Sequence, residues 1–370
     1  MRSLLTFLTL TPLALACTQR TEPVKGSASS DSAAPAPADK PKGGAGTIDL
    51  QGAGATFPYP LYSKWVAEYQ KHDPKVRINY QSIGSGGGIR QITEKTVDFG
   101  ASDAPMSDDE LAKVAPAKLV HIPTTLGAVV VAYNLPDVKT GLRLSPEVIA
   151  GIFLGDIKVW DDPKIVKDNP EVKLPKDSIT VAYRSDGSGT TAVFTDYLAK
   201  VSAPWKDKVG AGKSVKFPVG LGAKGNEGVA GQIKTSPGTV GYIELAYAKQ
   251  TGATFAFVKN GAGKFVEPTL DAISAAAAAA AANMPADFRV SITDAAGDAA
   301  YPISSFTYIL VYQDVTDAVK GKAVADFLWW AIHDGQKLGP DLFYAPLPAQ
   351  VVASEEAKLK TLTAGGKPLL

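Results

Sequence analysis

The chain has 370 residues, with 38 Lys and Arg against 37 Asp and Glu, and a formal net charge of +1. Apolar residues make up 45% and charged residues 20%, which excludes a wholly disordered or fibrous protein and, at this length, favours two domains. A single Cys and three scattered His argue against an internal disulfide and a metal centre. The near-neutral charge argues against nucleic acid as a partner, because a basic face would be needed to neutralise its phosphates.

The first residues have the pattern of an export signal. Arg2 precedes an uncharged run of 13 residues, Leu4–Ala16. This run is too short to span a bilayer, which takes roughly 20 residues, and is typical of a signal-peptide core. It ends directly before Cys17, as in bacterial lipoprotein signals. We therefore predict a signal peptide over residues 1–16 and a lipid on Cys17, with ordinary secretory cleavage nearby as the alternative.

A tether is predicted to follow. Of the 21 residues from Gly26 to Gly46, 17 are Gly, Ala, Ser or Pro. Such a segment has little apolar area to bury, so residues 17–46 are expected to form a flexible link to a folded body that starts near Thr47.

Predicted strands and helices alternate along the body. Short apolar or β-branched runs predict strands at 48–50, 76–80, 97–101, 126–133, 240–243 and 303–312. Periodic patterns predict helices at 59–71, 89–96, 190–200 and 319–332, and loops are expected at 52–55, 82–88 and 186–189. This alternation indicates an α/β fold with largely parallel sheets. The eight alanines of Ala275–Ala282 predict a surface helix.

Enzyme signatures fail on inspection. Gly210–Ser214 resembles a phosphate-binding P-loop, but that motif needs Gly where Asp207 stands. Gly84–Ile89 misses the last position of the dinucleotide-binding pattern. Neither Ser85 nor Ser188 has the flanking glycines of a nucleophile elbow. A phosphomonoesterase or serine hydrolase that uses one of these serines stays open as a weaker alternative.

Four short polar segments share one chemistry, and at least three lead into predicted helices. The first N–H groups of a helix lack internal partners and carry the positive end of its dipole, so they bind anions, and nearby glycines admit a ligand. The bland alternative for each segment is a simple helix cap. The segments are Ala55–Pro58, Gly84–Gly88, Ala101–Asp103 and Arg184–Thr190.

Two charged residues would define the anion. Arg184 offers a fork of donors suited to a tetrahedral oxyanion, and Asp186 could orient that fork. Asp103 would repel an anion unless the anion carries a proton to donate, which phosphate does at neutral pH and sulfate does not. A carboxylate acceptor would therefore reject sulfate. The alternatives are a surface Arg–Asp pair and a cap role for Asp103.

With these segments, the chain closely resembles the periplasmic phosphate-binding proteins of phosphate-specific ABC transporters. The matches run in order over nearly the whole body, from about Gly52 to Pro348. They comprise Gly52–Pro58, Ile83–Ser85, Thr96–Pro105, Asp186–Thr190, Gly220–Asn226 and Gly241–Glu244.

The resemblance implies a set of phosphate-binding residues and no catalytic residue, metal or cofactor. Asp186 takes the place of the acidic partner of the arginine. Carried over position by position, the ligand residues are Thr56, Phe57, Ser85, Asp103, Arg184, Ser188, Gly189 and Thr190.

The resemblance also implies the two-lobed, type II periplasmic-binding-protein fold, with two mixed or parallel sheet domains joined by crossing strands near 123–131 and 301–311. Domain I would comprise 47–124 and 302–370, and domain II would span 125–301. Phosphate would bind between them, in a monomer exported to the periplasm or cell surface and held to the membrane only by lipid at Cys17. The partners would be the permease and ATPase subunits of an ABC phosphate importer. An adhesin or sensor that binds phosphate without delivering it is the other alternative.

Overall fold

The computed structural model describes residues 46–370. The predicted signal peptide, the predicted lipid site at Cys17 and the tether up to residue 45 lie outside the described residues. Within the described range, the helices are all too short or too polar to cross a bilayer.

A mixed nine-stranded sheet organises the described residues. Its order is β2-β1-β3-β12-β4-β8-β6-β7, with β9 beside β4. The outer groups around β1 and β6 are parallel, whereas β12 and β4 run antiparallel to their neighbours. The prediction of largely parallel sheets is therefore correct for the two outer groups and wrong for the centre. The strands are β1 Ile48–Gly54, β2 Val76–Ser82, β3 Phe99–Ser102, β4 Leu119–Tyr133, β6 Thr180–Arg184, β7 Leu221–Ala223, β8 Thr239–Glu244, β9 Thr254–Phe255 and β12 Ser304–Tyr312.

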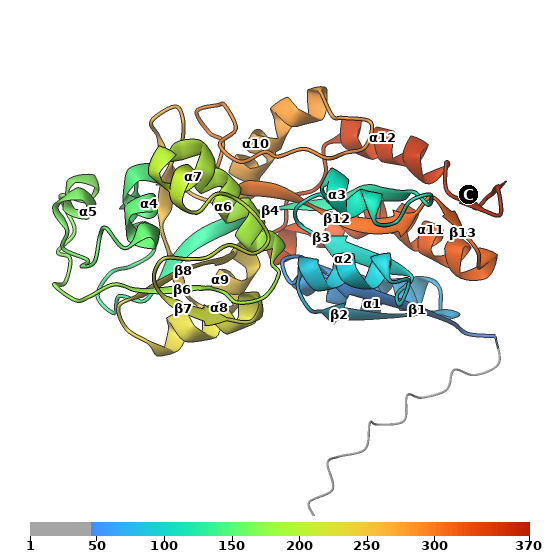
Figure 1. Ribbon diagram of the computed structural model, residues 1–370, viewed down its shortest axis with the longest axis horizontal. Coiled ribbons are helices and arrows are strands. Elements are labelled where there is room, and N and C mark those ends of the chain that lie inside the picture. Colours follow the sequence, from blue (N-terminus) through green and yellow to red (C-terminus); the bar gives the residue numbers. More distant parts are fainter. Residues whose placement is uncertain (1–45) are drawn as a thin grey trace, which may run out of the picture. The chain divides into compact units, whose positions relative to one another are not determined.

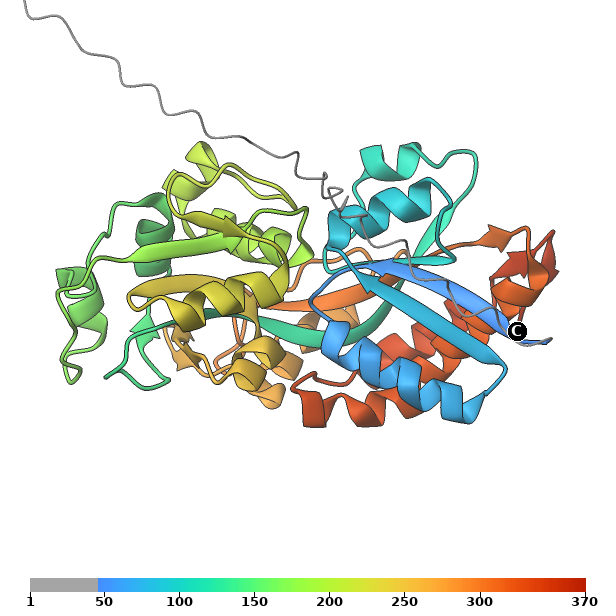
Figure 2. The same cartoon turned by 90° about the horizontal axis from the view of Figure 1, so that it is seen from below.

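Helices gather around the two outer groups of strands, which we call the first lobe (β1 to β3) and the second lobe (β6 to β8) (Figure 1). In Figure 2 the blue and red ends of the described chain lie together in the first lobe, and α11 contacts β1. First-lobe helices are α1 Tyr59–His72, α2 Ser85–Thr93, α3 Asp108–Ala112, α11 Ala318–Ile332 and α12 Ala349–Leu359, with 3₁₀ turns η1 Asp334–Leu338 and η2 Pro340–Leu342. Second-lobe helices are α4 Pro146–Leu154, α5 Pro163–Asp168, α6 Gly189–Val201, α7 Ala203–Lys208, α8 Gly225–Thr235 and α9 Leu245–Thr251.

Two small sheets complete the fold. Their orders are β11-β10-β5 and β13-β14-β15. The strands are β5 Arg143–Leu144, β10 Phe257–Lys259, β11 Phe265–Val266, β13 Asp314–Val315, β14 Thr363–Ala364 and β15 Lys367–Pro368.

Strands β4 and β12 join the lobes, as the predicted crossing strands at 123–131 and 301–311 require. They pair antiparallel, and the register shifts at Thr307, so that Thr124 on β4 is left without a direct partner. Bulges of this kind redirect side chains near functional sites. The predicted boundaries between the domains stay a prediction.

Two predicted loops are partly regular structure instead. β1 continues to Gly54, and α2 begins at Ser85, so that of the loop expected at 82–88 only Ile83 and Gly84 remain outside an element, and Gly86–Gly88 lie in the first turn of the helix. A side chain at Gly88 would place Cβ only 2.5 Å from Gly54 Cα. Gly88 is therefore needed because α2 packs directly against β1, whereas Gly84 has a φ of 89°, which favours glycine at the turn into the helix.

The alanine-rich segment forms α10, Leu270–Ala282, which begins at the capping hydroxyl of Thr269. The prediction of a surface helix is only partly correct, because Ile273, Ala276 and Ala277 are buried. This face of α10 contacts β4 and β12. The small alanines allow a close approach to the crossing strands, which composition alone does not reveal.

Glu355 on α12 is fully buried, and neither carboxyl oxygen has a hydrogen-bond partner among the described residues. Burial raises its pKa well above 4.5, so the folded protein keeps a proton there that the unfolded chain loses. Stability is therefore expected to fall as pH rises above 4.5. Relative to the wild type, Glu355→Gln should gain about 1.4 kcal/mol of unfolding free energy per pH unit over that range. Urea unfolding at several pH values tests this, and a difference independent of pH would contradict it.

Candidate anion-binding site

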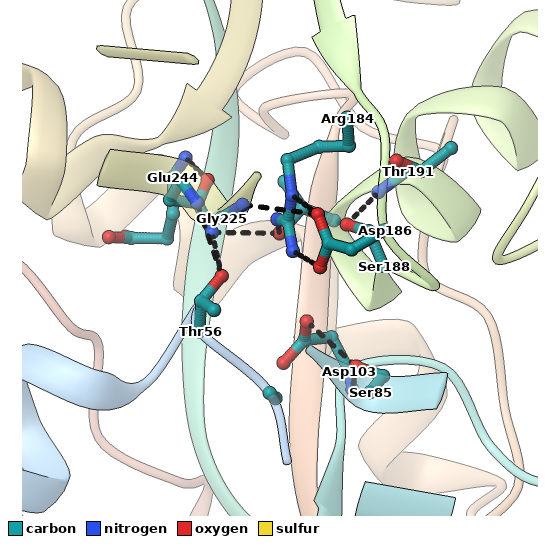
Figure 3. Close-up of polar contacts among 12 residues, drawn as sticks. Thr56, Ser85, Asp103, Arg184, Asp186, Ser188, Thr191, Gly225 and Glu244 are labelled. Atoms are coloured by element: carbon teal, nitrogen blue, oxygen red, sulfur yellow. Dashed lines mark hydrogen bonds and ion pairs between the residues drawn. The ribbon is translucent and has the colours of Figure 1, made fainter. Parts of the chain in front are cut away.

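The four polar segments singled out in the sequence come together where the two lobes meet. Each lies at or just after the carboxyl end of a parallel strand: β1, β2, β3 or β6. Ligands of open α/β sheets bind outside these ends. The lobes touch here, because the Gly86 N–H donates to the Gly187 carbonyl at 2.8 Å. Figure 3 shows side chains from both lobes facing one another.

Thr56 and Phe57 lie between β1 and α1, and both are buried. The Thr56 carbonyl accepts from the Tyr247 hydroxyl of the second lobe at 2.6 Å, and the Phe57 carbonyl accepts from Tyr344 at 2.6 Å. The Phe57 ring fills the space beside Gly127 on β4, where a Cβ would lie 2.6 Å from it. The loop that carries the predicted ligand residues is thereby fixed against both lobes.

Ser85 and Asp103 form the acidic side of the site. The Asp103 carboxylate accepts from the Thr307 hydroxyl at 2.8 Å and, more weakly, from the Ser85 hydroxyl at 3.4 Å. Burial raises the pKa of Asp103 to about 7, against the lowering effects of Thr307, Arg184 and Ser85. Asp103 caps no helix, and Ser85 lies inside α2, whose capping position is Gly84. The cap alternatives for these two residues are therefore wrong.

Arg184 and Asp186 form the basic side. Arg184 Nε and Nη2 donate to the two oxygens of Asp186 at 2.8 and 2.6 Å, as Figure 3 shows. The Arg184 side chain is only 1% exposed, so this is not a surface pair. Burial raises the pKa of Asp186, but the hydrogen bonds and charge of Arg184 outweigh this effect and hold it below its usual value. The two-point contact does not use Nη1, which faces the site and makes only a long contact of 3.4 Å with Thr190 Oγ1.

Helix α6 starts at the same place. Ser188 is its N-cap, and its hydroxyl accepts from the Thr191 N–H at 3.0 Å. The cap alternative is thus correct for Ser188, yet the hydroxyl proton remains available for donation. Gly189 and Thr190 are the first residues of the helix, where N–H groups have no intrahelical acceptor. Their N–H groups and the helix dipole provide positive potential without a further formal charge.

The aromatic core of the second lobe supports this arrangement. The Tyr242 hydroxyl accepts from the Arg184 N–H at 3.1 Å and shares a hydrogen bond of 2.7 Å with Thr191. The Tyr242 ring stacks on Phe194, with centroids 4.4 Å apart. A buried stack therefore orients both the end of β6 and the start of α6.

The structure adds two polar residues that the sequence analysis did not assign. Thr307 reaches Asp103 from the bulged part of β12. Asn226, at the start of α8, donates to the Thr56 hydroxyl at 2.8 Å. For Asn226 a signal existed, because Gly225-Asn226 has the same small, polar helix-start pattern. For Thr307 there was none.

The chemistry of the site suits a small anion. Within residues 46–370 no cluster of three or more His, Cys, Asp or Glu is arranged to hold a metal. His121 accepts from the Met106 N–H, and His333 contacts Glu356 and the Trp329 carbonyl, so neither pairs with Ser85 or Ser188. The hydrolase alternative thus lacks a base from these histidines.

This fold and site define a two-lobed protein of the PBP superfamily. The family model described as "PBP superfamily domain" matches residues 28–334. A crystal structure of a high-affinity periplasmic phosphate-binding protein, PfluDING, bound with phosphate has a TM-score of 0.67. At 24% identity, it covers 84% of this chain and 93% of its own, and it confirms the predicted two-lobed fold.

Curated relatives narrow the class. The chain is 46% identical over 313 residues to "Phosphate-binding protein PstS" of Pasteurella multocida, covering 84% of this chain and 90% of the relative. The protein of the same name from Xylella fastidiosa is 46% identical over 312 residues, covering 84% and 85%. That of Methanocaldococcus jannaschii is 42% identical, covering 82% and 84%. The chain belongs to the family of the phosphate-binding protein PstS.

Proposed function

We propose that the protein binds inorganic phosphate between its two lobes and delivers it to a membrane ABC phosphate importer. Its relatives are named for phosphate binding. The partnership with a transporter follows from the resemblance to the phosphate-binding proteins of phosphate-specific ABC transporters. The protein is a binding protein and not an enzyme. Its partners are phosphate and the permease and ATPase subunits of the importer.

The observation that carries the proposal is that a buried arginine of the second lobe and a buried carboxyl of the first lobe lie on opposite sides of the contact between the lobes (Figure 3). Counted as whole residues, Arg184 is 4% exposed and Asp103 is 1% exposed. A tetrahedral anion held there would receive donors from both lobes, and its own proton would go to Asp103. The ligand residues are Thr56, Phe57, Ser85, Asp103, Arg184, Ser188, Gly189 and Thr190, with Asp186 in support.

Contact between the lobes suits a receptor that signals its loaded state. A ligand that touches both lobes stabilises the closed arrangement to the extent that it binds this arrangement more tightly than the open one.

In the same proposal, domain I comprises 47–124 and 302–370, and domain II spans 125–301. The exported protein is a monomer held to the membrane by lipid on Cys17. Mass spectrometry of the mature N-terminus tests the lipid, and an unmodified or absent Cys17 would refute it.

Titration calorimetry tests the binding. The purified protein, first freed of ligand by partial unfolding and dialysis, should bind phosphate tightly and sulfate far more weakly. Uptake of labelled phosphate by cells with and without the protein then tests delivery. Tight binding without any effect on uptake would favour the sensor or adhesin alternative, and absence of binding would reject the proposal.

Gly189→Ala is expected to weaken phosphate binding by steric conflict between the lobes. An added Cβ would lie 2.3 Å from Asp103 Oδ2 and 2.4 Å from Ser85 Oγ, both in the other lobe. Overpacking of this kind costs roughly 1–3 kcal/mol, or about 5- to 150-fold in affinity. Gly231→Ala in α8, where a Cβ meets nothing within 4 Å, is the matched control. Equal affinities of the two variants in calorimetry would contradict the prediction.

A further inference from the structure

Asn226 is a fully buried side chain that connects the two lobes. Its Nδ2 donates to Thr56 Oγ1 at 2.8 Å in the first lobe and to Thr190 Oγ1 at 3.0 Å in the second. Its Oδ1 accepts from the Glu244 N–H at 2.9 Å. One carboxamide thus contacts a proposed ligand residue from each lobe. The sequence match over Gly220–Asn226 gave it no role.

The orientation of this carboxamide is determined by its surroundings. A backbone N–H can only donate, so the atom that faces Glu244 must be the oxygen. The amino group therefore faces Thr56 and Thr190, and each of its two protons has one hydroxyl to bond. No alternative flip of Asn226 satisfies all three contacts.

This contact determines what the two hydroxyls can do. A hydroxyl has one proton and two lone pairs. Thr190 Oγ1 accepts from Asn226 Nδ2 and from Arg184 Nη1, the latter at 3.4 Å. Thr56 Oγ1 accepts from Asn226 Nδ2 and from the Asn226 N–H, the latter at 3.4 Å. With their lone pairs occupied, both hydroxyls can only donate, and the described residues offer neither proton an acceptor.

We propose that Asn226 is a specificity-determining positioning residue that holds the Thr56 and Thr190 hydroxyls as donors. This inference rests on the phosphate binding proposed above. A hydroxyl that can only donate stabilises an ionised oxygen and repels a P–OH group. The ligand proton then goes to Asp103. The site accepts hydrogen phosphate, which has one proton, and rejects dihydrogen phosphate, whose second proton meets a donor.

Proton counting tests the inference. Calorimetry in buffers of different ionisation enthalpy gives the number of protons released for each phosphate bound. At mildly acidic pH most free phosphate carries two protons, and the wild type must release the second one on binding, together with the proton that Asp103 holds below its pKa of about 7. Asn226→Ala lets the hydroxyls turn and accept, so the variant should release about one proton fewer per phosphate than the wild type. At mildly alkaline pH, where the ligand has only one proton, the two counts should agree.

Controls separate this role from a structural one. Asn169→Ala removes another buried amide of the second lobe, which bonds the backbone of Arg143, and should leave the proton count unchanged. Thr190→Val should weaken binding yet keep the wild-type count, because valine cannot accept a proton. Asn226→Leu keeps the branched shape of the side chain without its polar atoms, and replaces the alanine variant if that variant unfolds.

Each outcome decides the matter. An unchanged proton count in the Asn226 variant, with affinity lowered equally at every pH, would overturn the inference and leave Asn226 a purely structural residue. A wild type that shows no heat of phosphate binding at any pH would overturn the proposed function together with this inference. A lower proton count in Asn226→Ala, with the wild-type count in Asn169→Ala and Thr190→Val, supports both this inference and the proposed function.

Discussion

Replacing Arg184 by methionine should weaken phosphate binding by roughly 2–5 kcal/mol, or about 30- to 4,000-fold. The substitution keeps an unbranched stem but shortens the side chain and removes its guanidinium charge. It also leaves Asp186 buried without its partner, so a negative charge would remain beside the anion. Titration calorimetry with phosphate at neutral pH measures the loss.

The matched control is Arg77→Met. Arg77 on β2 also makes a two-point contact with an aspartate, Asp49, but it lies at the partly exposed surface of the first lobe. Its replacement should change phosphate affinity less than about threefold, since exposed pairs contribute little. Equal losses in Arg184→Met and Arg77→Met would mean that Arg184 has no direct part in binding.

Asp103→Asn should remove most of the preference for phosphate over sulfate. The amide has a donor that a fully ionised sulfate oxygen can accept, and an oxygen that can still accept the proton of phosphate. Sites built around a required hydrogen bond reject a ligand that lacks it by a factor on the order of 10⁴, so the ratio of affinities should fall at least about a hundredfold. Competition of sulfate against phosphate measures it. Asp98→Asn, which removes a carboxylate paired with Lys320 elsewhere in the first lobe, should keep the wild-type ratio.

The affinity of the wild type for sulfate should depend on pH, in a direction that the pKa of Asp103 determines. Sulfate can bind the wild type only when Asp103 carries a proton, and the pKa of Asp103 is about 7. Sulfate affinity should therefore rise about tenfold per pH unit as pH falls towards 7, and level off below it. In Asp103→Asn this dependence should vanish. A wild-type sulfate affinity that does not change with pH would contradict the role of Asp103.

Local patterns predicted the parts of the site that depend on neighbours in the sequence. The strand ends and helix starts at Thr56, Ser85, Asp103 and Ser188 follow from small polar residues placed between apolar runs. The strands at 126–133 and 303–312 followed from their continuous apolar runs, whereas their role as crossing strands came from the resemblance. For the strand ends and helix starts the pattern lies within one strand–turn–helix unit, so a short window of sequence suffices.

Contacts between distant segments were not predictable in this way. Thr307 reaches Asp103 over 204 positions, and Asn226 reaches Thr56 over 170 positions. The helical glycines of α2 were mistaken for a loop, because the need for glycine comes from distant contacts: Gly88 packs against β1, and Gly86 against Gly187 of the other lobe. Whether a polar residue caps its own helix or serves a remote partner is decided by tertiary packing.

A crystal structure of the protein grown with inorganic phosphate would show directly where the anion binds. We expect one phosphate between the lobes, with its oxygens about 3 Å from the Arg184 guanidinium and the N–H groups of Gly189 and Thr190, and one oxygen against Asp103. Phosphate bound elsewhere, or Arg184 turned into solvent away from Asp103 in a phosphate-saturated crystal, would contradict it.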